Sequence, residues 1–265
     1  MSNCKCHNKH NPLNCILPPY VLETLAERGT AEEREFARKA LVDGHTVRDE
    51  RVSIASATPR ARGAAAGVAK KRTIYSANNT TQLPGIKVRS EGQVATGDAA
   101  VDEAYDGAGA TFDLYQDVYG RNSIDNQGME LISTVHFGQN YNNAFWNGQQ
   151  MTYGDGDQSL FNRFTIAIDV IAHEMTHGVV QHEANLVYQN QPGALNESFA
   201  DVFGSLVKQR TLNQTAAQAD WLIGAGLFTS SINARGIRSM KAPGTAYDDP
   251  KIGKDPQPAH MNNIY

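Results

Sequence analysis

Two histidines with a glutamate between them are the clearest chemical signal in the sequence. Residues 173–177 (HEMTH) lie inside residues 164–182, whose apolar positions recur at the spacing expected of a helix. Positions four apart share one helix face, so His173 and His177 can bind a single metal ion. Neutral imidazoles suit Zn²⁺, and Glu174 is close enough to take a proton from a metal-bound water without being a ligand itself.

A catalytic zinc ion needs a third protein ligand and one open position. A second helix is expected over residues 193–210, where Glu197 follows His177 by twenty residues. Two antiparallel helices joined by a loop of this length bring Glu197 opposite the histidine pair. Asp201 lies one turn later on the same face, and is predicted to accept the remaining N–H of a metal-bound histidine. The alternative is a helix whose histidines are ordinary core or surface residues, and the spacing of Glu197 and Asp201 argues against it.

Several further motifs make the sequence similar to the thermolysin-like zinc metallopeptidases. The similarity extends from Thr73 to Tyr247 and includes the stretches NNAFWNG at 142–148, YGDGD at 153–157, GALNE at 193–197 and RSM at 238–240. The leading segment, with CILPPY at 15–20, resembles the short propeptide of the protealysin-type branch of this family.

The resemblance implies an α+β fold with a β-rich N-terminal lobe, a long central helix carrying the HExxH motif, and a truncated helical C-terminal lobe. The expected divisions are a propeptide-like segment at 1–52, a linker or processing region at 53–72, the N-terminal catalytic lobe at 73–182 and an incomplete helical lobe at 183–265. Within the first segment the spacing predicts two short amphipathic helices, and Thr30 to Glu33 has the pattern of a capping box.

The resemblance also implies a role for each matching residue. His173, His177 and Glu197 would be the zinc ligands and Glu174 the general base of an endopeptidase that cuts before bulky apolar residues. Tyr188 would donate a hydrogen bond to the oxyanion, and Arg238 would hold a substrate carbonyl. Asn143 and Ala144 would bind the substrate backbone as an added strand. The walls of the apolar pocket would be Phe161, Phe164, Val170 and Ile237. Each of these wall residues is as well explained as plain core.

The sequence departs from the family at the second oxyanion donor. The family carries a histidine in an Asp-Asn-Gly-Gly-x-x-His stretch, and the surroundings of His260 do not match it. Such a donor is worth about 3–4 kcal/mol, so we expect a truncated copy with little or no activity. The alternatives are an inactive homologue that binds zinc and peptide, and a structural protein that only stores zinc. Retention of Glu174 argues against a pure binder, which has no use for a general base.

The expected calcium ligands are also incomplete. Asp169 and Asp220 remain in the region where the family gathers carboxylates, but Lys208, Leu222 and Ala225 stand where others are expected. Calcium needs several oxygen ligands, so we expect no double calcium site and at most a weak single one.

All three cysteines lie in the first fifteen residues, so no disulfide bond crosses the rest of the chain. One hypothesis is that Cys15 blocks the open position of the zinc until the segment is removed. The alternatives are a flexible head with incidental Cys and His residues, and a separate zinc-binding module built on Cys4, Cys6 and neighbouring histidines.

Composition limits the partners. The net charge of −4 is too mild for a nucleic-acid binder, and no run of eighteen apolar residues is present to span a membrane. The first twenty residues lack the apolar core of a signal peptide, which leaves cytoplasmic location or leaderless secretion, with secretion implied by the family. The expected partners are a peptide or protein substrate and the chain's own propeptide, and the expected state is a monomer.

Overall fold

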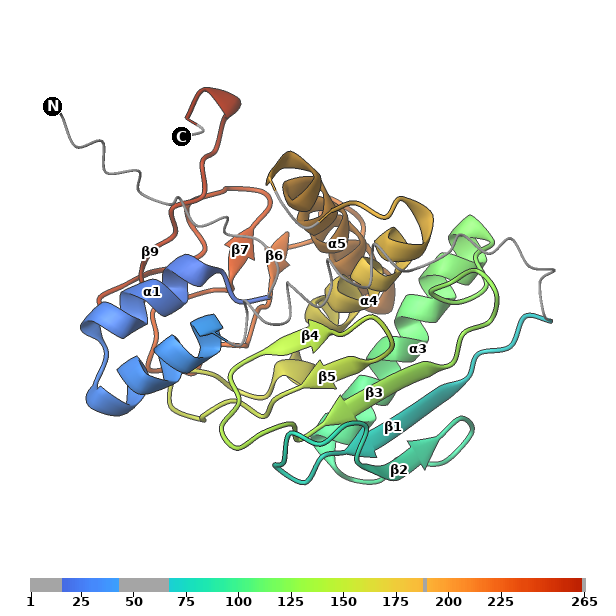
Figure 1. Cartoon of the computed structure of the whole chain (residues 1–265). Helices are drawn as coiled ribbons and strands as arrows, with labels where there is room; N and C mark the ends of the chain where they lie inside the picture. The colour runs from blue at the N-terminus through green and yellow to red at the C-terminus, as the bar shows by residue number, and fades with distance from the viewer. Residues whose placement is uncertain (1–15, 43–66, 188–189, 264–265) are drawn as a thin grey trace, which may run out of the picture.

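A long buried helix, α4 (Ile168–Glu183), runs through the centre of the structure, with α5 (Asn190–Thr211) against it on one side (Figure 1). Every residue of α4 from Asp169 to Val180 is buried, and because this stretch includes charged and polar side chains, those groups need partners inside the protein. The helix α3 (Ala99–Tyr119) and the sheet contact α4 from the other side. The computed structural model describes residues 16–42, 67–187 and 190–263.

A five-stranded mixed sheet forms the N-terminal part, in the order β2-β1-β3-β5-β4. Its two inner pairs are parallel and its two outer pairs are antiparallel, which leaves β4 at one edge. The strands are β1 (Arg72–Ser76), β2 (Ile86–Ser90), β3 (Leu131–Val135), β4 (Ala144–Trp146) and β5 (Met151–Tyr153). The alternation around β3 suggests a half-buried strand, but four of its five residues are buried because neighbours cover the central strand.

The two helices of the motifs differ slightly from their expected bounds. Residues 164–182 divide into a 3-10 turn, η1 (Phe164–Ile166), and α4, because Ala167 between them is extended. After α5 the described chain forms short strand pairs and turns rather than further long helices. These are β6 (Leu222–Ile223), β7 (Arg238–Ser239), β8 (Asp248–Asp249), β9 (Gly253–Lys254) and η2 (Met261–Asn263).

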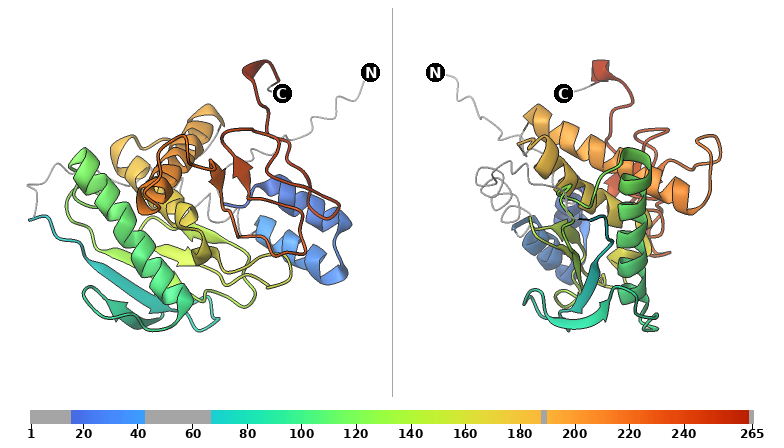
Figure 2. Two further views of the ribbon diagram at one scale, coloured as in Figure 1. Left: turned by 180° about the vertical axis from the view of Figure 1, so that it is seen from behind. Right: turned by 90° about the vertical axis from the view of Figure 1, so that its right-hand side faces the viewer.

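The N-terminal segment forms α1 (Pro19–Arg28) and a second helix over residues 31–42, which lie beside the β8–β9 region (Figures 1 and 2). The capping box is confirmed, since Thr30 N–H donates to Glu33 Oε2 at 2.7 Å and Glu33 N–H donates to Thr30 Oγ1 at 3.3 Å. The apolar side chains of this segment belong to the same core as the sheet and α4, and are Ile16, Leu17, Val21, Leu22, Leu25, Ala37 and Ala40. The segment is therefore docked on the rest of the chain.

The expected boundary at 52/53 and most of the linker lie outside the described residues, and β1 begins one residue before Thr73. Among the helices that are described, none combines the length and the apolar character needed to cross a membrane.

A lysine ammonium ties α5 to the start of α4 and to the loop before β6. Lys208 Nζ lies 3.1 Å from Asp169 Oδ2, 3.0 Å from Asp220 Oδ1 and 3.0 Å from the Leu222 carbonyl oxygen. Asp169 is only 1% exposed, and its other carboxylate oxygen accepts a hydrogen bond from Gly224 N–H. Burial raises the pKa of Asp169, so its charged form depends on the neighbouring ammonium.

We expect Lys208→Met to lower the free energy of unfolding by about 3–5 kcal/mol, because it leaves a buried carboxylate without its counter-charge. The matched control is Arg210→Met on the same helix, which removes an ion pair with Asp117 whose side chains are about half exposed and should cost under about 1 kcal/mol. Urea unfolding of both variants measures the difference. Equal losses would contradict the interpretation, whereas partial recovery in Asp169→Asn/Lys208→Met would support it.

Candidate active site

The structure brings the two histidines of α4 and Glu197 of α5 to one point. Their possible ligand atoms all lie within 4.8 Å of one another, and all three residues are buried. The two Nε2 atoms of His173 and His177 are 3.0 Å apart. Glu197 Oε2 lies 3.3 Å from His173 Nε2, and its Oε1 lies 3.4 Å from His177 Nε2. No other such group of three appears among the described residues.

A glycine lets the two helices approach closely enough for this convergence. A Cβ atom placed on Gly204 of α5 would lie 2.6 Å from the carbonyl oxygen of Asp169 in α4. Any side chain there would push the helices apart. Glu197 lies seven residues before Gly204, which is two turns along the same face. The contact at Gly204 therefore places the Glu197 carboxylate over α4.

Both histidines are oriented from behind by oxygen atoms on α5. His173 Nδ1 lies 2.8 Å from Asp201 Oδ1, and His177 Nδ1 lies 2.9 Å from Asn196 Oδ1. Both oxygens accept, so each Nδ1 carries the proton and each Nε2 lone pair faces the point of convergence. Asn196 was not singled out from the sequence, although it stands in the GALNE stretch directly before Glu197.

The donor set fits a catalytic zinc ion. Two imidazole nitrogens and one carboxylate are a recognised ligand set for a zinc that keeps an open position. Burial alone would lower the pKa of His173, but Asp201 and Glu197 outweigh it and raise that pKa to about 9. Burial alone would raise the pKa of Glu197, but the two imidazoles and Arg238 lower it to about 2. The carboxylates thus stay charged, and a cation binding here displaces a proton.

Arg238 lies directly behind this cluster, on β7. Its Nε and Nη2 donate to the two carboxylate oxygens of Asp201, both at 2.7 Å. Its Nη1 donates to the carbonyl oxygen of Ile16 at 3.0 Å. The sequence-based role of Arg238 is to hold a substrate carbonyl, and in this structure the carbonyl comes from the chain's own N-terminal segment.

Glu174 is fully buried on α4, and its Oε2 accepts the backbone N–H of Trp146 at 3.1 Å. The Trp146 indole N–H in turn donates to Gln181 Oε1 at 3.1 Å. The indole packs close to α4 because position 178 is glycine, where a Cβ would lie 3.1 Å from the ring. Gln181 anchors β4 to the helix that carries Glu174, and no pattern in the sequence marks this role.

The outer edge of β4, where the sheet ends, faces this glutamate. Gly154 N–H bonds the Asn143 carbonyl and Asn147 N–H bonds the Gln150 carbonyl, so these positions point toward β5. In an antiparallel ladder alternate residues turn their backbone groups to opposite sides, so those of Ala144 and Trp146 point away from β5. The side-chain oxygen of Asn143 accepts the Ala144 N–H at 2.9 Å.

The remaining candidate residues are placed as follows. A cavity of about 600 Å³ opens beside the cluster, and its lining includes Pro18, Tyr20, Glu197, Asp201, Arg238 and Met240. The four predicted pocket walls do not line that cavity. They are fully buried in the main core, at Phe161, Phe164, Val170 and Ile237. Tyr188 and Cys15 lie outside the described residues.

Comparison with known families agrees with this geometry. The family described as "Thermolysin metallopeptidase, catalytic domain" matches residues 42–181, and "Thermolysin metallopeptidase, alpha-helical domain" matches residues 184–265. The chain belongs to the thermolysin metallopeptidase family.

Two curated relatives and one solved structure show the same similarity over almost the whole chain. An extracellular metalloprotease of Pectobacterium carotovorum subsp. carotovorum is 52% identical over 96% of this chain and 72% of its own length. Protease PrtS of Photorhabdus sp. (strain Az29) is 45% identical over 97% of this chain and 69% of its own length. The precursor of protealysin from Serratia proteamaculans superimposes with a TM-score of 0.83 at 52% identity, covering 95% of this chain and 73% of that one.

For this thermolysin-family chain we expect Gln181→Leu to lower kcat for peptide hydrolysis by a larger factor than it raises KM. The substitution frees the Trp146 indole, so β4 no longer holds Glu174 in one position, and KM rises to a smaller extent because β4 also borders the site. Gln181→Glu keeps an acceptor for the indole N–H and is the matched control. A rise in KM at constant kcat in Gln181→Leu would contradict this positioning role.

Proposed function

We propose that this chain is the precursor form of a zinc-dependent endopeptidase that hydrolyses peptide bonds before bulky apolar residues. The observation that supports it is the convergence of His173, His177 and Glu197 beside Glu174, at the outer edge of β4. The relatives carry the names of proteases, which favours an enzyme over an inactive binder or a zinc store.

The residues of the chain divide the work between binding and proton transfer. A substrate strand adds to the outer edge of β4 through the backbone of Ala144, and the side chain of Asn143 assists. His173, His177 and Glu197 would hold a zinc ion, which would supply Lewis-acid chemistry by polarising the scissile carbonyl and making water more acidic. Glu174 accepts the proton of the attacking water and returns it to the leaving amine nitrogen. Arg238 binds a substrate carbonyl beyond the cut, and Tyr188 donates to the oxyanion.

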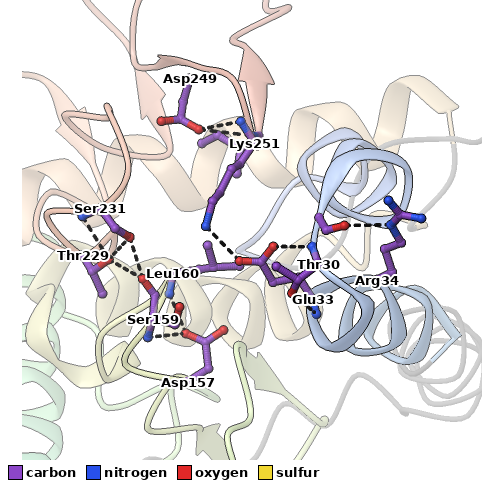
Figure 3. A network of polar contacts seen from close by, with 12 residues as sticks. Thr30, Glu33, Arg34, Asp157, Ser159, Leu160, Thr229, Ser231, Asp249 and Lys251 are labelled. Carbon is purple, nitrogen blue, oxygen red and sulfur yellow. Dashed lines mark hydrogen bonds and ion pairs between the residues drawn. The ribbon is translucent and has the colours of Figure 1, made fainter.

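The N-terminal segment is proposed to act as the propeptide of this enzyme. The Ile16 carbonyl occupies the Arg238 donor that substrate needs, and Pro18 and Tyr20 line the cavity beside Glu197. On the other side of the segment, Lys251 Nζ lies 3.0 Å from Glu33 Oε1, as Figure 3 shows. Glu33 thus caps its own helix and also binds the body of the protein. Substrate and this segment cannot occupy Arg238 together.

We also propose that the protein uses zinc without calcium, because the Lys208 ammonium binds the oxygens of Asp169 and Asp220 that a calcium ion would need. The name of the relative from Pectobacterium carotovorum includes the word extracellular, and we propose that this protein likewise works outside the cell, as a monomer.

The proposal is tested by measuring metal content and peptide hydrolysis in the wild-type chain and in Glu174→Gln. We expect about one zinc per chain in both proteins and hydrolysis only in the wild type, with a loss of at least about 10²-fold in the variant. Chelation should abolish the wild-type activity and added Zn²⁺ should restore it. Peptides with Leu or Phe after the scissile bond are compared with matched peptides carrying Asp there.

The alternatives give different results in the same experiment. If the chain binds zinc but shows no peptide hydrolysis that depends on Glu174, it is a peptide binder. If it does not bind zinc, it is a structural protein. His177→Ala serves as the control for the metal site, because it should lose zinc and activity together.

We expect the double variant Leu22→Asn/Leu25→Asn to hydrolyse peptides faster than the wild-type chain. Both leucines are buried under the docked segment, so polar replacements undock α1 and free Arg238 for substrate. Glu27→Gln changes an exposed residue of the same helix and is the control. Slower or equal hydrolysis in the double variant, with zinc retained, would contradict the inhibitory role of the segment.

A further inference from the structure

A continuous path of polar contacts, partly buried at Asp201 and buried at its other members, joins the N-terminal segment to a zinc ligand. It runs from the Ile16 carbonyl to Arg238 Nη1 at 3.0 Å, from the guanidinium to Asp201 at 2.7 Å, and from Asp201 Oδ1 to His173 Nδ1 at 2.8 Å. Ile16 and His173 are fully buried, and Arg238 is only 8% exposed. Two side chains therefore separate the segment from the metal site.

Each contact in this path fixes the next one. A guanidinium that donates two parallel hydrogen bonds holds a carboxylate in one plane and one orientation. The carboxylate in turn fixes the ring and the tautomer of the imidazole, and the partners of metal ligands are worth about 10–100-fold in metal affinity. Arg238 uses Nε and Nη2 for Asp201, so Nη1 is the donor that Ile16 satisfies.

Withdrawal of Ile16 removes this acceptor from a buried cation. A buried N–H group without a partner is costly, so the guanidinium shifts toward water or toward a new acceptor. Because the same guanidinium holds both oxygens of Asp201, its shift loosens the partner of His173. The state with the segment docked is thus the state with the metal ligand best oriented.

We propose that docking of the N-terminal segment and binding of zinc strengthen each other through Arg238 and Asp201. The inference rests on the zinc site and the propeptide proposed above, and adds a coupling between them. Arg238 is then a positioning residue for the metal as well as a binder of carbonyl groups. Coupling of this kind is reciprocal. Zinc must favour docking of the segment by the same factor by which docking raises the affinity for zinc.

The coupling sets an order for maturation. Before zinc binds, the N-terminal segment is docked less firmly. After zinc binds, the segment stays docked until the chain is cut between this segment and the rest of the protein. Loss of the segment then lowers zinc affinity, unless a substrate carbonyl takes the place of Ile16 on Arg238.

The test measures the zinc dissociation constant of the full chain by competition with a chromophoric chelator. All proteins carry Glu174→Gln, so that the chain stays intact. Undocking by Leu22→Asn/Leu25→Asn is expected to weaken zinc binding about tenfold when Arg238 is present. In Arg238→Lys, which keeps the charge but cannot bridge both partners, the same undocking should change zinc affinity by less than about twofold. Glu27→Gln again provides the control.

A reciprocal measurement keeps the proposal testable if one variant folds poorly. Amide hydrogen exchange over residues 19–28 should slow when zinc is added to the Arg238 protein, and should not respond to zinc in Arg238→Lys. If zinc does not change the amide exchange rates of residues 19–28 in either protein, the proposed coupling is wrong. Equal weakening of zinc binding by undocking in both backgrounds would overturn the role of Arg238.

Failure of the inference can be distinguished from failure of the proposed function. If zinc binding does not depend on His177, the zinc site itself is wrong. If it depends on His177 but not on docking of the segment, the enzyme assignment stands and only the coupling is wrong.

Discussion

The close approach of α4 and α5 is the constraint on which the rest of the site depends. Two imidazoles and a carboxylate converge only if the helices nearly touch. Gly204 allows this approach because it has no side chain. Convergence alone is not enough, because each buried imidazole also needs a partner for its second nitrogen. Asp201 and Asn196 supply those partners from the same helix as Glu197. One face of α5 therefore carries a candidate metal ligand and also the residues that orient the two histidines.

The same face explains why the N-terminal segment can control the site. Asp201 is held from outside by Arg238, and Arg238 is the residue that binds the Ile16 carbonyl. If Arg238 binds a substrate carbonyl as proposed above, the segment takes the place of that part of the substrate backbone. Removing the segment leaves α4, α5 and β4 in place, since they are held by their own core contacts, and changes only the support that Arg238 and Asp201 give to His173.

Local pattern and long-range packing differ in how far the sequence reveals them. The helical spacing of residues 173–177 and the capping box of Thr30 and Glu33 are local, so both could be predicted from neighbouring residues. The bond between Arg238 and Ile16 joins positions 222 residues apart, and nothing near either residue announces it. Gln181 is hidden for the same reason, because its partner Trp146 belongs to a strand that only the folded sheet brings alongside α4.

Lys208 can be noticed in the sequence, but the contacts of its ammonium group cannot be predicted from it. The sequence displays a lysine where carboxylates are expected, but only the fold shows its ammonium within 3.1 Å of oxygens from Asp169, Asp220 and Leu222. A free cation at such a place would stabilise the folded state only in proportion to its occupancy. An ammonium tethered to α5 is present in every folded molecule, so it holds α4 and α5 together whatever ions surround the protein. The relative position of the two helices that carry His173, His177 and Glu197 then depends at this point on the chain itself.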